Sequence, residues 1–307
     1  TVFGIATSLG LGAQQINAGL NYLADMTIGI TTQIGLIGVI SLVATVSALT
    51  GVNRGIRILS VLNMRLTLLI LLAFFVLGPT SYLITSLANN TLDYLVNLPK
   101  LSFWVDPDTE SPWQNSWTIF YWGWWIAWAP FVSMFIARIS RGRTIREFVI
   151  GVLLAPTLLA IVWLTIFGNT AIYLQLFENS GIAAAVNQDL TSALFKTIES
   201  MKANTILTTT IATVCVILLV TYFVTSADSA TLVICTLITM GDPNPSQRLR
   251  IFWGVAIGSV AAALLFSGGL AALQTASILA ALPFSIVVIL ASFSLCTGLY
   301  KEVQERR

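Results

Sequence analysis

The chain has 307 residues, of which 56% are hydrophobic and 9% charged, and its mean hydropathy is +0.87. Soluble domains carry about 25% charged residues, so this composition excludes an ordinary soluble domain and indicates an integral membrane protein. Histidine is absent, the three cysteines lie alone in apolar runs without metal-ligand spacing, and nothing supports nucleic-acid binding. Because the sequence opens inside an apolar segment without methionine, we expect it to be part of a longer protein.

In chain order, eight segments have the roughly 20 mostly apolar residues that a membrane-spanning helix needs. The segment between the third and fourth is more polar, and its "LDYLVNL" is expected to form an amphipathic helix at the membrane interface. The stretch 185–202 has the same character. The predicted fold class is therefore all-α integral membrane, with spans at 1–20, 30–50, 65–85, 117–137, 149–174, 204–238, 250–267 and 273–300.

Two of these spans carry polar residues at membrane depth and are expected to be interrupted. The first contains "TSLGLGAQQINAGL", and the sixth contains "TSADSA" at 225–230, where Asp228 is the only acid deep in an apolar span. Polar groups inside a membrane usually face a bundle interior or a wet cavity, and broken helices in transporters mark ion and substrate sites. Two roles for Asp228 stay open, proton coupling and the acceptance of structural hydrogen bonds.

The basic residues predict the orientation in the membrane, because they gather in cytoplasmic loops. With eight alternating spans, the opposite loops hold three lysines and eight acids, namely Lys100, Lys196, Lys202, Asp25, Asp93, Asp106, Asp108, Glu110, Glu178, Asp189 and Glu199. The C-terminus is therefore predicted to be cytoplasmic. Twelve of the fifteen basic residues fall on that side: Arg54, Arg57, Arg65, Arg138, Arg141, Arg143, Arg146, Arg248, Arg250, Lys301, Arg306 and Arg307.

The segment "FYWGWWIAWAPF" at 120–131 holds four of the nine tryptophans and no charged residue. Such a one-sided aromatic wall suits a quaternary ammonium, whose methyl groups contact ring faces for about 0.5–2 kcal/mol each. The alternative is an aromatic belt at the membrane interface, which needs only one or two rings at each end of a span. On a helix, seven aromatic residues fall within an arc of about 140° that leaves out Trp122: Trp117, Phe120, Tyr121, Trp124, Trp125, Trp128 and Phe131.

The segment "SWTIFYWGWWIAWAPFVSMFIARISRGRTIREF" at 116–148 closely resembles the signature of the betaine/choline/carnitine transporter (BCCT) family. The resemblance extends through "ATSLGLGAQQINAGL", "GVNRGIRILS", "FGNTAI", "FVTSADSA" and "ALPFSIVVI". It implies a LeuT-type inverted-repeat fold of twelve spans, often trimeric, of which this chain would hold the fifth to the twelfth. The first four helices, with further cage aromatics, would be missing.

The resemblance also implies how the chain is divided. It forms a single transmembrane transporter domain over 1–307. Within it, 1–85 is the end of the first repeat, 86–116 an extracellular amphipathic connection, 117–300 the second repeat and 301–307 the start of a cytoplasmic tail.

Carried onto this sequence, the resemblance implies a substrate path lined by Tyr121, Trp124, Trp125 and Trp128, with Trp125 in the central cage. In sodium-coupled members of the family, a hydroxyl pair on the sixth span holds the ion. Here that pair is Thr225 and Ser226, with the carbonyl of Tyr222 as a further ligand.

A second sodium site would lie beside Phe131, with Thr1 as one of its hydroxyls. Ile5 stands where the family has threonine, which argues against this second site. No cofactor is expected beyond the coupling ion, H⁺ or Na⁺.

The segments "TVFGIATSLG", "LRIFWGVAIG" and "LPFSIVVI" look most like the choline-importing, proton-driven branch of the family. The predicted function is therefore import of choline or glycine betaine by alternating access across a bacterial inner membrane. Sodium-coupled betaine symport for osmoprotection is the alternative, while the intact Thr225–Ser226 pair argues against carnitine-type exchange.

An enzyme is disfavoured, since there is no nucleophile with a base and no phosphate loop. A channel or a sensor would bind the same ligands without transport against a gradient.

Overall fold

The computed structural model describes residues 1–50, 57–108, 110–242 and 244–305. Within these ranges the chain is helical and contains no strand, as predicted for the fold class. Arg54, Arg306 and Arg307, which contribute to the predicted charge asymmetry, lie outside the described residues, as does the first part of "GVNRGIRILS". The α-helices are α1 (Val2–Ala24), α2 (Ile30–Thr50), α3 (Arg57–Leu77), α4 (Thr80–Ser102), α5 (Phe120–Ile139), α6 (Ile145–Glu178), α7 (Ile182–Gln188), α8 (Ala193–Ser200), α9 (Thr205–Ile238) and α10 (Gln247–Glu305).

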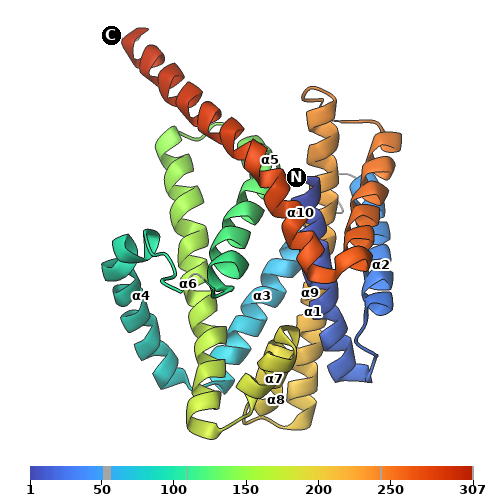
Figure 1. Cartoon of the computed structure of the whole chain (residues 1–307), viewed down its shortest axis with the longest axis vertical. Helices are drawn as coiled ribbons and strands as arrows, with labels where there is room; N and C mark the ends of the chain where they lie inside the picture. The colour runs from blue at the N-terminus through green and yellow to red at the C-terminus, as the bar shows by residue number, and fades with distance from the viewer. Residues whose placement is uncertain (51–56, 109, 243, 306–307) are drawn as a thin grey trace.

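Helix α1 is the centre of the bundle, and it packs against α2, α5, α9 and α10 (Figure 1). Its small residues allow this close approach, as small residues do between membrane helices. A Cβ atom at Gly12 would lie 2.3 Å from the ring of Phe223 on α9, and one at Gly10 would lie 2.2 Å from Leu273 on α10. The glycines of the polar first span are therefore packing positions for neighbouring helices.

The same kind of packing joins α2 to the first part of α10. A Cβ atom at Gly254 would lie 2.3 Å from Thr45, and one at Gly258 would lie 2.2 Å from Ser41. These two glycines stand four residues apart on one helical face, the small-xxx-small spacing of closely packed membrane helices. A second group of helices, in which α4 packs on α6, lies at the other side of α3 (Figure 1).

Among the described residues, six helices are long and apolar enough to cross a membrane: α2, α3, α6, α9, α10 and the segment Gln114–Ala137. The predicted spans 250–267 and 273–300 are the two parts of α10, which departs from helical geometry at Gly268 and Gly269. Gly269 has φ +63°, a left-handed conformation that glycine adopts without steric cost. The first predicted span is also a helix, α1, although its polar residues keep it out of the set of six.

The predicted bounds of the third span, 65–85, are wrong. Helix α3 begins at Arg57 and ends at Leu77, and α4 begins at Thr80. Pro79 has no N–H and disfavours helical geometry in the residue before it, so Gly78–Pro79 ends one helix and allows a new direction for the next. The predicted amphipathic segment "LDYLVNL" lies inside α4 and is helical as expected.

The expected interruptions of the first and sixth spans are also wrong, because α1 and α9 are continuous α-helices. In α9, the polar side chains bond back to their own helix instead of opening it. Thr225 Oγ1 donates to the carbonyl of Thr221 at 3.0 Å, and Thr231 Oγ1 donates to that of Ala227 at 2.7 Å. This local bonding satisfies the two threonine hydroxyls within the helical geometry, and "TSADSA" crosses the bundle without a break.

Candidate functional site

The aromatic residues of α5, together with Trp117 in the π-helical segment Gln114–Ile119 before it, form a continuous series of ring contacts, here called the aromatic ladder. The ladder extends one turn beyond the predicted arc, to Phe135. Each contact has a centroid distance of 6.3 Å or less, so the rings are mutually supported along the helix. Its members are Trp117, Phe120, Tyr121, Trp124, Trp128, Phe131 and Phe135.

Helix α1 fixes two of these tryptophans by their indole N–H groups. Trp124 Nε1 donates to the carbonyl of Gly4 at 3.1 Å, and Trp128 Nε1 donates to Ser8 Oγ at 3.2 Å. Both bonds engage the edges of the rings rather than their faces, and Phe120 stacks on one face of Trp124 with a centroid distance of 5.5 Å. The central helix of the bundle therefore sets the orientation of the tryptophans that were predicted to line a substrate path.

The contact between Gly4 and Trp128 gives a first testable prediction. A Cβ atom at Gly4 would lie 2.6 Å from Cδ1 of Trp128, so Gly4→Val should displace the indole at a cost of about 1–3 kcal/mol, the usual range for overpacking. We expect a lower melting temperature for the purified protein in detergent. Gly168→Val is the control, because a Cβ atom at Gly168 has no neighbour within 4 Å. Equal melting temperatures of the two variants would contradict the predicted contact.

Trp125, the predicted centre of the cage, does not join the ladder. Its side chain is 66% exposed on the surface of α5, as is that of Trp122 at 69%. Trp124 and Trp125 are neighbours in sequence and therefore point about 100° apart on the helix. The structure thus brings Tyr121, Trp124 and Trp128 together and places Trp125 outside their contacts.

The region predicted for a second sodium site is mostly apolar. Ile5 and Phe131 are both buried and belong to the same hydrophobic core. Phe131 contacts the rings of Trp128 and Phe135, so it is an inner member of the ladder. Among the described residues, Ile5 brings no side-chain oxygen to this place, and Thr1 is half-buried one turn earlier.

Thr225 of the predicted hydroxyl pair on α9 meets a second set of polar residues on α3. Asn63 Nδ2 donates to Thr225 Oγ1 at 3.1 Å, and the hydroxyl of Thr67 is hydrogen-bonded to that of Tyr222. Asn63 and Thr67 lie one turn apart on α3, as Tyr222 and Thr225 do on α9. We call Asn63, Thr67, Tyr222 and Thr225 the α3–α9 polar cluster.

The sodium ligands predicted on α9 lie within or beside this cluster. The carbonyl of Tyr222 accepts a hydrogen bond from Thr225 Oγ1 at 2.9 Å, so these two predicted ligands are adjacent. Ser226 follows on the same helix and is half-buried. Side-chain and carbonyl oxygens of this kind are the ligands that hard cations prefer.

Asp228 is fully buried between α9 and α2. Its carboxylate accepts hydrogen bonds from Ser47 Oγ of α2 at 2.6 Å and from Ser229 Oγ at 3.1 Å. A buried carboxyl group is tolerated when hydrogen bonds compensate its lost solvation. The geometry therefore supports the structural role of Asp228, since both of its oxygens already have hydroxyl donors.

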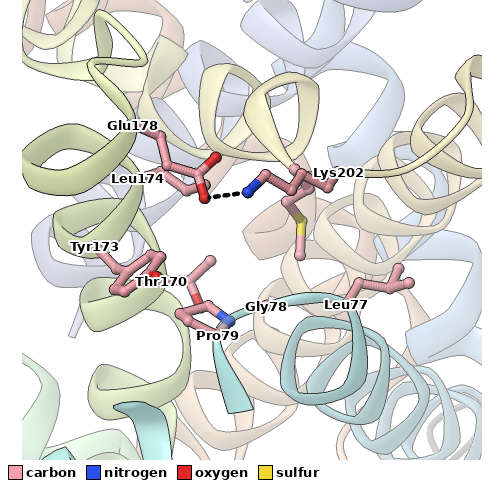
Figure 2. Close-up of a pocket in the computed structure, with 9 residues that line it drawn as sticks. Leu77, Gly78, Pro79, Thr170, Tyr173, Leu174, Glu178 and Lys202 are labelled. Atoms are coloured by element: carbon pink, nitrogen blue, oxygen red, sulfur yellow. Dashed lines mark ion pairs between the residues drawn. The ribbon is translucent and has the colours of Figure 1, made fainter. Parts of the chain in front are cut away.

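A cavity of about 200 Å³ lies at the opposite end of the bundle from the C-terminus, between the α3–α4 turn, α6 and the segment before α9. Figure 2 shows Lys202 reaching across it to Glu178, with a distance of 2.8 Å between Nζ and Oε1. The hydrogen bond and the opposite charge of Glu178 raise the pKa of Lys202 above its ordinary value. The ion pair neutralises the one carboxylate that lines this cavity, and the lining includes a single aromatic ring, Tyr173, so the cavity lacks the aromatic faces of a quaternary-ammonium site.

Neither Asn63 nor Ser47 was among the predicted site residues. Asn63 is one asparagine in an apolar helix, and its partner Thr225 is 162 residues away in sequence. The only signal available in the sequence was a polar residue at membrane depth, which marks a functional candidate. That rule was not applied to Asn63, because the predicted third span began at residue 65 whereas α3 begins at Arg57.

Comparisons with known proteins agree with the resemblance seen in the sequence. A family model described as "BCCT, betaine/carnitine/choline family transporter" matches residues 1–304. The glycine betaine transporter OpuD of Bacillus subtilis is 44% identical over 99% of this chain and 59% of its own length. The ectoine/hydroxyectoine transporter of Virgibacillus pantothenticus is 42% identical over 96% of this chain and 58% of its own length.

A third relative is the osmo-independent choline transporter BetT1 of Acinetobacter baylyi. It is 41% identical over 99% of this chain and 59% of its own length. The chain thus spans less than two thirds of the length of these relatives. Their identities of 41–44% lie too close together to favour one named substrate over another.

Proposed function

This chain belongs to the BCCT family of betaine, carnitine and choline transporters, and we propose that it forms part of a secondary transporter that imports a quaternary ammonium compound. The relatives are named as transporters of glycine betaine, ectoine and choline, which supports a transporter rather than an enzyme. Transport would proceed by alternating access, with the substrate held near the middle of the membrane.

The single observation that carries the proposal is the aromatic ladder of α5. A trimethylammonium group has no N–H donor, so carboxylates and carbonyls recognise it poorly. Aromatic faces bind it through their quadrupoles, and the attraction grows when water is excluded. In the ladder, α1 holds the edges of Trp124 and Trp128 by hydrogen bonds, so their faces are presented in fixed orientations.

Trp125 completes the proposed cage from the neighbouring face of α5. Its ring is largely exposed in this chain, so the cage needs an opposing surface. The family resemblance implies helices of the first repeat that precede these residues, and the proposal assigns the opposing surface to them. The substrate is choline or glycine betaine, because both carry the same trimethylammonium group.

The proton and the sodium ion are the two candidate coupling ions of this transporter. Proton coupling agrees with the resemblance to the choline-importing branch and with Ile5, which removes a sodium hydroxyl. Sodium coupling is supported by the α3–α9 polar cluster, whose oxygens suit a hard cation. The geometry favours sodium at this cluster, because Asp228 already accepts two hydroxyl hydrogen bonds and is poorly placed to exchange protons with water.

The protein would lie in a bacterial inner membrane as a multi-pass protein, with its C-terminus in the cytoplasm, as the basic loops indicate. We propose a homotrimer, following the resemblance to the family. The large apolar side chains exposed along α6, such as Leu153 and Leu164, would contact lipid.

Radiolabelled uptake into proteoliposomes tests the function. The full-length protein should accumulate choline or betaine above the external concentration when a sodium gradient is imposed. A proton gradient imposed alone distinguishes the two coupling ions. Uptake that stops at equal concentrations inside and outside would instead identify a channel, and saturable binding without any uptake would identify a sensor.

A further inference from the structure

We propose that Asn63 of α3 is a positioning residue for a sodium ion at Thr225 and Ser226, and that its side-chain amide sets the sodium affinity of that site. The inference rests on the sodium-coupled form of the proposed function. It adds a helix, α3, to a site whose sequence-predicted ligands all lie on α9. The juxtaposition that carries it is Asn63 against Thr225, joined at 3.1 Å.

The directions of the hydrogen bonds support this role. The hydroxyl of Thr225 donates its proton to the backbone of its own helix, at 3.0 Å to Thr221 and 2.9 Å to Tyr222. Its lone pairs are therefore the part of the oxygen that faces other groups. The N–H of Asn63 occupies one lone pair and fixes the rotation of the side chain, which leaves the remaining lone pair in a defined direction. An oxygen atom that binds a cation needs to be held in such a fixed orientation.

The second, independent observation is an orphaned atom on Asn63 itself. The residue is 4% exposed, and its Oδ1 is buried without a hydrogen-bond donor among the described residues. Leaving such an acceptor unpaired destabilises the folded protein. A cation beside Thr225 would relieve this cost, because amide oxygens are good ligands for hard cations.

The contact between Thr67 and Tyr222 holds the two helices together one turn away. Thr67 Oγ1 also contacts the carbonyl of Asn63 at 2.7 Å, so the two polar residues of α3 are linked. Thr67 is 4% exposed, as Asn63 is. The α3 half of the cluster is therefore buried, and two side-chain contacts one turn apart anchor it to α9.

Thermal unfolding of the purified full-length protein tests the inference without any transport assay. Sodium that binds the folded state raises the melting temperature by mass action, and potassium at the same total salt concentration serves as the reference. We expect Asn63→Leu to raise the half-saturating sodium concentration about tenfold, the equivalent of roughly 1.4 kcal/mol. Asn63→Asp loses the N–H that donates to Thr225 but places a negative charge beside the cation, and because the charge attraction is the larger effect it should lower that concentration about threefold.

Asn169→Leu is the matched control. Asn169 is a buried asparagine of α6, 8% exposed, whose Nδ2 also lacks a partner among the described residues. Its replacement should leave the sodium titration unchanged. An Asn63→Leu titration that matches the control overturns the inference, and so does an unchanged or raised value for Asn63→Asp, which decides the question even if Asn63→Leu does not fold.

The outcomes separate this inference from the proposed function. A protein that responds to sodium as expected but takes up neither choline nor betaine refutes the transport proposal and keeps the assignment of Asn63. A protein that imports choline with a proton gradient and shows no thermal response to sodium overturns the assignment and keeps transport.

Discussion

Trp125→Leu is expected to weaken choline or betaine uptake about thirtyfold, as an increase in KM, because a desolvated cation–π contact contributes about 2 kcal/mol. The residue lies outside the ring contacts of the aromatic ladder and is 66% exposed. If it only faced lipid, leucine would replace it without loss. The measurement is initial uptake into proteoliposomes over a range of substrate concentrations.

Trp122 provides a matched control on the same helix. It is 69% exposed, carries the same indole group and lies three residues before Trp125, outside the predicted arc. Trp122→Leu should leave KM within about twofold of the wild-type value, which is the scatter of a surface substitution. Equal KM values for the two variants would show that Trp125 has no part in a cage.

Thr225→Val is expected to raise the sodium concentration for half-maximal uptake about tenfold or more. Valine keeps the branched shape of threonine and removes the oxygen, so a cation would lose one ligand and Asn63 would lose its acceptor. Interactions with charged groups contribute about 1.5–3 kcal/mol each, which corresponds to this change. The assay is uptake at saturating substrate over a sodium titration.

Thr210→Val is the control for this experiment. Thr210 lies on the same helix, is exposed, and donates its hydroxyl only to the carbonyl of Ile206 at 2.7 Å. Its replacement should leave the sodium dependence unchanged. If Thr225→Val also left the sodium dependence unchanged, the hydroxyl would be structural, and the proton-coupled form of the transporter would be the better description.

The fold was largely predictable because hydrophobic length determines where membrane helices lie. The segments that became α1, α2, α5, α6, α9 and the two parts of α10 were all expected as spans. The error at the third span has a local cause: Gly78 and Pro79 end a helix inside an apolar run that hydropathy treats as continuous. A helix-ending signal therefore outweighs hydropathy where the two disagree.

The candidate site was only partly predictable from the sequence. Periodicity places Trp124 and Trp125 in one aromatic arc, but it does not say which side of the arc meets α1. That depends on hydrogen bonds to Gly4 and Ser8, more than 100 residues away in sequence. The continuity of α9 depends in the same way on where each hydroxyl finds its acceptor, which residue type alone leaves open.

In the proposed cage, aromatic faces recognise the positive charge of a trimethylammonium group. The most direct test compares choline with 3,3-dimethylbutan-1-ol, which has the same shape with carbon in place of the charged nitrogen. Each compound is titrated as an inhibitor of radiolabelled choline or betaine uptake by the full-length protein. A cage of this kind predicts that the neutral analogue inhibits at least about thirtyfold more weakly than choline. Inhibition of equal strength would mean that the pocket recognises shape and apolar surface alone, and it would contradict the proposed role of the aromatic ladder.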